Sequence, residues 1–146
     1  MADAIKKIEN SKFAKTAEGK KVVAKIQSLQ KDGKIKFKSL GATTRGQWGG
    51  GEITVNETYK DDTDAIASEL VHEATHALNE DEFPASKTKA TIDEEMRTNK
   101  NQLDLYEEQR DDGFRDSELE RRRKANQDGK LRDDVKSRYP TLPGSL

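Results

Sequence analysis

The hydrophobic and polar positions of this 146-residue chain predict one helix, two strands and then further helices. Apolar residues recur at helical spacing over roughly 16–31, and Asp32-Gly33 supplies a C-terminal stop. Residues 34–38 alternate apolar and charged side chains, as a half-buried strand does, and residues 52–56 are a second candidate strand. A glycine-rich loop over 41–51 connects them and carries the only tryptophan.

The next part of the chain is predicted to be helical. A helix is expected over 63–79, with Asp62 or Thr63 as its N-terminal cap. After a loop over 80–90, a threonine and a glutamate at capping-box spacing begin another helix, which runs to about Arg110.

The last third of the chain is almost entirely charged. Its few apolar anchors are consistent with short helices packed on the domain or with partial disorder. These anchors are Phe114, Leu119, Leu131, Val135 and Tyr139. The prediction is a compact α+β fold with a core over residues 1–110 and a charged C-terminal segment over 111–146 packed on it.

Composition narrows the classes of partner. With 31% hydrophobic and 38% charged residues, the chain can build one small core. Its net charge of -1 does not predict a nucleic-acid or anionic-membrane partner, and a monomer is expected. The longest apolar stretches are too short to span a membrane. The N-terminus lacks a signal-peptide pattern, so a cytoplasmic protein is expected, and the absence of cysteine excludes a cysteine zinc site.

The segment Val71-His-Glu-Ala-Thr-His-Ala77 contains an HExxH motif. Residues four apart lie one above the other on a helix, so His72 and His76 can reach one cation. Glu73 lies about 100° around the helix from His72, close to the metal but in another direction. It can take a proton from a metal-bound water and later give it to the leaving amine.

The surrounding helix supports this placement. An apolar stripe lies beside the histidines, so one edge of a core helix is expected to border a cleft. His72 and His76 are also the only two histidines in the chain. The alternative is a pair of surface or capping histidines without metal, but the coincidence of motif and stripe favours Zn²⁺ binding.

The third ligand must be a carboxylate, because catalytic zinc usually keeps three protein ligands and no histidine remains. Asp93, Glu94 and Glu95 are adjacent candidates at the start of the following helix. Glu95 lies about 60° from the centre of that helix's apolar face, which is expected to be buried, and Glu94 about 160° away. Glu95 is therefore the predicted ligand, and Glu94 is assigned to the capping box with Thr91.

Asn99 lies one turn after Glu95 on the same face. It is a candidate for a hydrogen bond to a ligand histidine. An ordinary half-buried helix amide is an equally good interpretation.

These motifs resemble the gluzincin metallopeptidases, in which HExxH is followed by a glutamate on a second helix. The segments that resemble the family are His72-Glu-Ala-Thr-His76 and Glu95-Met-Arg-Thr-Asn99. Asn99 stands where the family's Glu-x-x-x-Asp pattern has an aspartate. Over roughly residues 4–110 the order of elements, including the run EEMRTNKNQ, is similar to minimal metallopeptidase domains of bacterial effectors and polymorphic toxins, such as NleD-like effectors.

The resemblance implies a zincin-like domain with a small sheet, an active-site helix and a glutamate helix. It also implies a zinc endopeptidase acting on a protein substrate in a host or rival cell, a specialised secretion apparatus and an immunity protein. By the same resemblance, Ile53 and Val55 would form the cleft rim and pair with an extended substrate. Trp48 would flank that rim, although a hydrophobic plug is its simpler role.

The residue that stabilises the oxyanion cannot be a histidine here. Tyr139 is the favoured candidate, because a C-terminal segment could fold back over the cleft, with packing as its alternative role. The basic cluster over 120–124 is surrounded by acids and is expected to be a solvated helix face. Two other functions stay open: a housekeeping or DNA-associated metalloprotease, and a non-catalytic binding module stabilised by metal.

Overall fold

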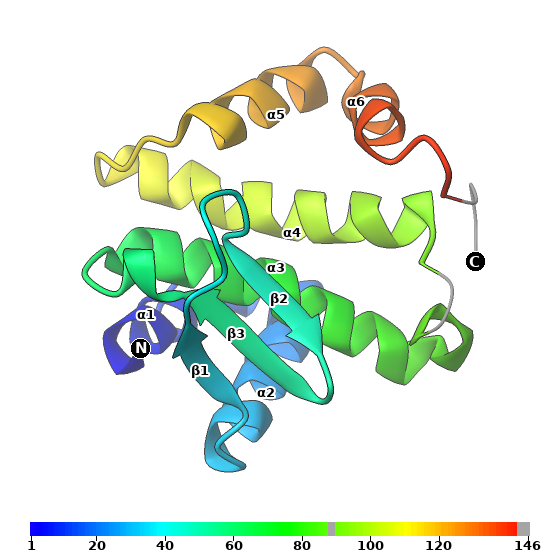
Figure 1. Ribbon diagram of the computed structural model, residues 1–146. Coiled ribbons are helices and arrows are strands. Elements are labelled where there is room, and N and C mark those ends of the chain that lie inside the picture. The colour runs from blue at the N-terminus through cyan, green and yellow to red at the C-terminus, as the bar shows by residue number, and fades with distance from the viewer. Residues whose placement is uncertain (88–89, 143–146) are drawn as a thin grey trace.

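A computed structural model describes residues 1–87 and 90–142 of the chain (Figure 1). It has six α-helices and a three-stranded sheet among the described residues, which confirms the predicted α+β class. The elements are α1 (Ala2–Glu9), α2 (Ala17–Lys31), β1 (Ile35–Lys38), β2 (Gly46–Gly49), β3 (Glu52–Asn56), α3 (Thr63–Glu82), α4 (Ile92–Asp111), α5 (Ser117–Gln127) and α6 (Leu131–Arg138). Short 3-10 helices occupy Phe13–Lys15, Glu57–Tyr59 and Pro84–Lys87.

The sheet has the order β1-β3-β2, with β1 parallel and β2 antiparallel to the central strand β3. Trp48 lies opposite Ile53 in this register. The backbone N–H of Asn56 donates to the backbone carbonyl of Arg45 at 2.8 Å. Along an antiparallel strand, residues whose backbone N–H and C=O groups bond the partner strand alternate with residues whose groups point away from it. Arg45 bonds β3, so the backbone groups of Gly46 and Trp48 point away from β3. Within the described part of the chain, β2 is therefore a free edge.

Helix α3 is the centre of the molecule and contacts α1, α2, α4, β2 and β3. Its predicted apolar stripe is buried, with Ile66, Leu70, Ala74 and Ala77 at most 2% exposed. The Asp62 carboxylate caps the helix by accepting the Ala65 amide at 3.1 Å. The helix continues past the predicted end to Glu82. Phe83, the residue before Pro84, is no longer helical, because the helical conformation is disfavoured before a proline.

Helix α4 is buried on two faces, whereas only its apolar face was expected to be buried. Its apolar face packs against α5 and α6, in a second core formed with Leu119, Leu131 and Val135. The face that packs against α3 is instead rich in polar side chains. Those that are buried include Glu94, Glu95, Thr98, Asn101 and Gln102. Helices α5 and α6 of the charged C-terminal segment lie along α4 (Figure 1), and their apolar residues cover its apolar face.

Two elements lay outside the sequence prediction. The first is α1, whose buried residues Ala4, Ile5 and Ile8 span too few turns to show a helical period. The second is β2, which lies in the predicted glycine-rich loop and is a strand because it pairs with β3. Over the described residues, none of the helices combines the length and apolarity needed to cross a membrane.

Candidate metal centre

Two neighbouring helices supply the three predicted ligands. His72 and His76 stand one turn apart on α3, and Glu95 lies in the first turn of α4. One ligand atom from each residue lies within 4.8 Å of the other two. The Nε2 atom of His76 is 3.5 Å from Oε1 of Glu95, and the two imidazole centroids are 5.1 Å apart. The crossing of α3 and α4 therefore creates a group that could hold a metal ion.

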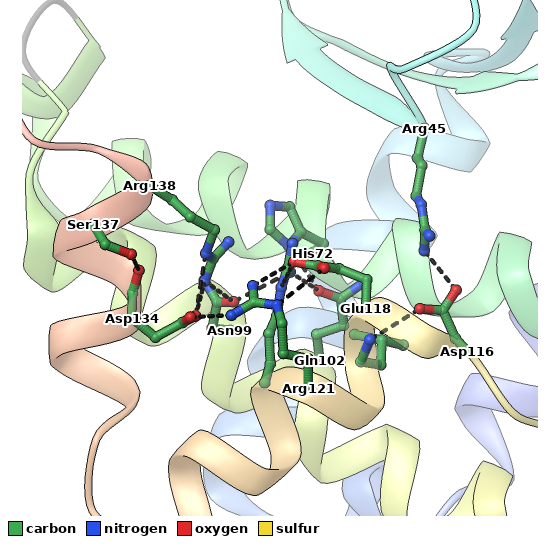
Figure 2. Close-up of polar contacts among 12 residues, drawn as sticks. Arg45, His72, Asn99, Gln102, Asp116, Glu118, Arg121, Asp134, Ser137 and Arg138 are labelled. Atoms are coloured by element: carbon green, nitrogen blue, oxygen red, sulfur yellow. Dashed lines mark hydrogen bonds and ion pairs between the residues drawn. The ribbon is translucent and has the colours of Figure 1, made fainter.

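A hydrogen bond to Gln102 fixes the orientation of His72 (Figure 2). The Nδ1 atom of His72 lies 3.0 Å from Oε1 of Gln102. The amide nitrogen of Gln102 donates to the Ser68 hydroxyl at 2.8 Å, so its oxygen is left to accept a proton from His72. This tautomer, assigned from the hydrogen-bond network, leaves the Nε2 lone pair available to a metal.

The carboxylate of Glu94 fixes the orientation of His76. The Nδ1 atom of His76 lies 3.1 Å from Oε2 of Glu94, and Oε1 of Glu94 accepts a hydrogen bond from the Asn79 side chain at 2.6 Å. The assignment of Glu94 to capping alone was wrong. Its backbone amide does donate to the Thr91 hydroxyl at 3.1 Å, but its side chain is buried against His76. Such histidine–carboxylate pairs orient metal ligands and increase their basicity.

Asn99 does not have the expected partner. Its amide nitrogen donates to the Glu95 carbonyl at 2.6 Å. Its side-chain oxygen accepts from Arg122 at 3.2 Å. The same oxygen accepts from Arg138 at 3.1 Å (Figure 2). The predicted hydrogen bond from Asn99 to a ligand histidine is therefore wrong, because Gln102 occupies that position for His72.

Glu73 is buried next to the ligands, at 7% exposure, with Oε1 3.9 Å from Nε2 of His72. Burial raises the pKa of Glu73 to about 7, reinforced by nearby carboxylates and opposed by His76. The backbone of Trp48 in β2 also hydrogen-bonds this carboxylate. A carboxylate with a pKa near neutrality is well matched to accepting and returning a proton.

The two histidines have opposite protonation preferences. Burial, together with the neighbouring His76, lowers the pKa of His72 to about 3 and keeps this ring neutral. Burial also opposes the charge on His76, but the carboxylates of Glu94, Glu95 and Glu73 outweigh it and raise the pKa of His76 to about 9. A cation is therefore electrostatically favoured beside these carboxylates, and a metal that binds here displaces the His76 proton.

The candidate metal centre lies between two hollows. One, of about 450 Å³, is lined by His72, Glu73 and Tyr139 and extends to Arg45 and Gly46. The other, of about 390 Å³, has a lining that includes Trp48, Glu73, His76 and Glu95. Glu73 borders both hollows, and β2 contributes Gly46 to the first and Trp48 to the second, so we refer to the two hollows together as the cleft.

The predicted rim residues lie elsewhere. Ile53 and Val55 are 0% exposed, and both sides of their strand are already paired, with β1 and β2. Their expected pairing with a substrate is therefore wrong. The edge strand beside the candidate centre is β2, where the backbone groups of Gly46 point away from β3 and the backbone of Trp48 bonds the Glu73 carboxylate.

No family model, curated protein or solved structure matches the chain. The interpretation of the site therefore depends on its donors, their orientation and their surroundings.

The C-terminal helices add residues that were not predicted to be near the centre. Arg122 was expected on a solvated face, but its guanidinium is half-buried and lies 3.5 Å from the Gln102 oxygen that holds His72. Burial and the neighbouring Arg138 lower the pKa of Arg122. Tyr139, the predicted oxyanion candidate, lines the cavity beside His72 and Glu73. The recurrence of polar residues every three or four positions on α4 is the signal that could have indicated a second buried face there.

Proposed function

We propose that this protein is a zinc-dependent endopeptidase of the gluzincin type, with His72, His76 and Glu95 as ligands and Glu73 as the general base. The observation that carries the proposal is the meeting of three donors from α3 and α4 with both imidazoles held through Nδ1. Zinc–ligand bonds of about 2.0–2.2 Å in a tetrahedron place ligand atoms about 3.3–3.6 Å apart. The 3.5 Å between His76 and Glu95 fits this spacing.

The proposed roles follow from chemistry and position. Zinc in such a site polarises a scissile carbonyl and lowers the pKa of a bound water. Glu73 accepts the proton from the attacking water and returns it to the leaving amine. Gln102 and Glu94 hold the two imidazoles through their Nδ1 atoms, which leaves both Nε2 atoms for the metal once the His76 proton is released.

The free edge of β2 supports an extended polypeptide as substrate. The backbone groups of Gly46 point away from β3, and a peptide can pair with them as an added strand. Trp48 lines one of the hollows and also packs against the main core, so it serves the cleft wall and the fold together. This arrangement assigns the rim function to β2 in place of β3.

Tyr139 is proposed to stabilise the oxyanion. Its ring lines the cavity beside His72 and Glu73, and the Arg138 guanidinium lies 5.8 Å from its centroid. A phenolic hydroxyl is a donor that can bind the negative oxygen that develops during amide hydrolysis.

The biological setting is proposed from the resemblance to effector and toxin metallopeptidase domains. It is delivery into a host or rival cell, with an immunity protein as the restraining partner. The DNA-associated alternative draws little support from the basic cluster. Arg121 pairs with Glu118 and Asp134, and Arg123 pairs with Glu107 at 2.5 Å, so these charges are engaged within the chain.

A comparison of new protein termini tests the proposal. Proteomes are incubated with zinc-loaded wild type and with Glu73→Gln, which keeps the size of the side chain but cannot accept the proton. We expect new termini with wild type only, while both proteins bind one zinc ion. If Glu73→Gln produced the same termini, or if wild type produced none, the peptidase proposal would be wrong and a metal-stabilised binding module would be favoured.

A further inference from the structure

A second buried carboxylate lies in the cleft and has no part in the mechanism above. Glu69 stands one helical turn before Glu73 on α3 and is 7% exposed. It lines the same cavity of about 450 Å³ as His72 and Glu73. A Cβ atom built on Gly46 would lie 3.3 Å from Oε2 of Glu69 and 3.4 Å from Cγ of Glu73, so both side chains lie directly beneath β2.

Three other charged side chains of this cavity, Arg45, Glu118 and Arg122, are paired within the chain. Arg45 donates to Asp116 at 2.6 Å (Figure 2). Glu118 accepts from Arg121 at 2.6 Å and from Arg122 at 3.1 Å. Each of these cavity charges therefore has a partner of opposite sign before any ligand enters.

Glu69 is different. Among residues 1–87 and 90–142, no cationic side chain lies within 4.0 Å of its carboxylate. The Gln102 amide hydrogen-bonds it, while Arg45 and Arg122 act on it only at longer range. Burial raises the pKa of Glu69 to about 7, as expected for a carboxylate removed from water without a counter-ion. A cation that enters the cavity would supply the missing partner.

We propose that this cavity is a specificity subsite for a lysine or arginine side chain next to the scissile bond, and that Glu69 is the carboxylate that recognises it. The inference rests on the proposed peptidase function, because it places the substrate across the candidate metal centre. The cavity volume of about 450 Å³ falls within the range of about 300–1,000 Å³ usual for ligand pockets. Because the cavity lies on the His72 side of the cleft, the basic residue occupies one fixed position relative to the cleaved bond.

Binding measurements test the subsite without relying on turnover. The protein is zinc-loaded Glu73→Gln, and the probes are fluorescein-labelled peptides with a single arginine moved through each position. Matched peptides carry norleucine, which has similar bulk and no charge. We expect arginine to strengthen binding at one position by about 10- to 100-fold over norleucine, the range of a charge-assisted hydrogen bond. Adding Glu69→Gln should remove this difference.

A matched control uses the other hollow. Glu80 lies on the same helix and lines the hollow on the His76 side. Glu80→Gln makes the same chemical change and should leave the arginine preference intact. If arginine and norleucine peptides bind equally to the protein that keeps Glu69, the subsite proposal is overturned whether or not any variant folds.

Cleavage by wild type separates this inference from the proposed function. Cleavage of peptide libraries without a preference for lysine or arginine would overturn the subsite and leave the peptidase standing. Glu69-dependent binding of arginine peptides without any cleavage would support the cation site and contradict the peptidase. With both proposals correct, Glu69→Gln lowers kcat/KM for arginine peptides by about 10- to 100-fold and leaves norleucine peptides nearly unchanged.

Discussion

Oε2 of Glu94 lies 3.1 Å from Nδ1 of His76, on the side of the ring opposite to the atom that faces Glu95. The other oxygen of Glu94 is bound by Asn79, so the carboxylate is held at both ends. This relationship fixes the His76 ring and directs Nε2 at the candidate metal position. It makes Glu94 a positioning residue.

Replacing Glu94 by glutamine should weaken zinc binding. Partners of this kind usually contribute 10- to 100-fold to metal affinity, and about that loss is expected for Glu94→Gln. Competition with a chromophoric chelator measures it, with His76→Ala as the reference for a lost ligand. Glu80→Gln, which changes a half-buried glutamate on the same helix as His76, is the control and should bind zinc as wild type does. An unchanged affinity for Glu94→Gln would contradict the positioning role.

Zinc binding should depend on pH through His76. In the metal-free protein the carboxylates around His76 raise its pKa to about 9, so at neutral pH a proton must leave before Nε2 can bind. Apparent affinity should therefore rise with pH and level off above about 9, where the ring is already neutral. Calorimetry in buffers of different ionisation enthalpy counts the protons released. In Glu94→Gln the pKa of His76 should fall, and the rise in affinity should end at lower pH.

Adding a side chain at Gly46 should obstruct the cleft. A Cβ atom there would lie 3.2 Å from the Thr54 carbonyl and 3.3 Å from Glu69. Gly46→Val should lower kcat/KM by about 10-fold or more, since misplacement near 1 Å carries costs of that size or larger. Gly49 lies in the same strand with open space around it, so Gly49→Val is the matched control. Equal activities of the two variants would show that substrate does not pass along this part of β2.

Removal of the Tyr139 hydroxyl should slow catalysis without affecting the metal. For Tyr139→Phe we expect kcat to fall by about 100-fold, as for loss of one oxyanion donor, with KM and zinc affinity near wild type. Steady-state kinetics and chelator competition give these values. A variant with wild-type kcat would limit Tyr139 to its packing against the second core.

Part of this structure could be predicted because it is local. The spacing of His72 and His76 fixes their shared side of α3, and the apolar stripe fixes which side is buried. Caps at Asp62 and Thr91 involve residues three apart and were equally accessible. Glu95 was selected from helical phase, and it meets the histidines when α4 packs on α3.

The remainder depends on how the helices cross. The apolar face of α4 is buried as predicted, but its sequence does not show that α5 and α6 are the elements that cover it. The face toward α3 is polar, which is why Glu94 and Gln102 reach the histidines unpredicted. Arg122 was hidden in a charged run, where sequence alone does not distinguish a buried guanidinium from solvated neighbours.

An anomalous difference map at the zinc edge, from crystals grown with zinc, tests the central claim most directly. We expect one peak within about 2.0–2.2 Å of Nε2 of His72, Nε2 of His76 and a carboxylate oxygen of Glu95, with one position left to solvent. Both Nδ1 atoms should keep their bonds to Gln102 and Glu94. A peak at another place, or imidazoles bound to zinc through Nδ1, would contradict it.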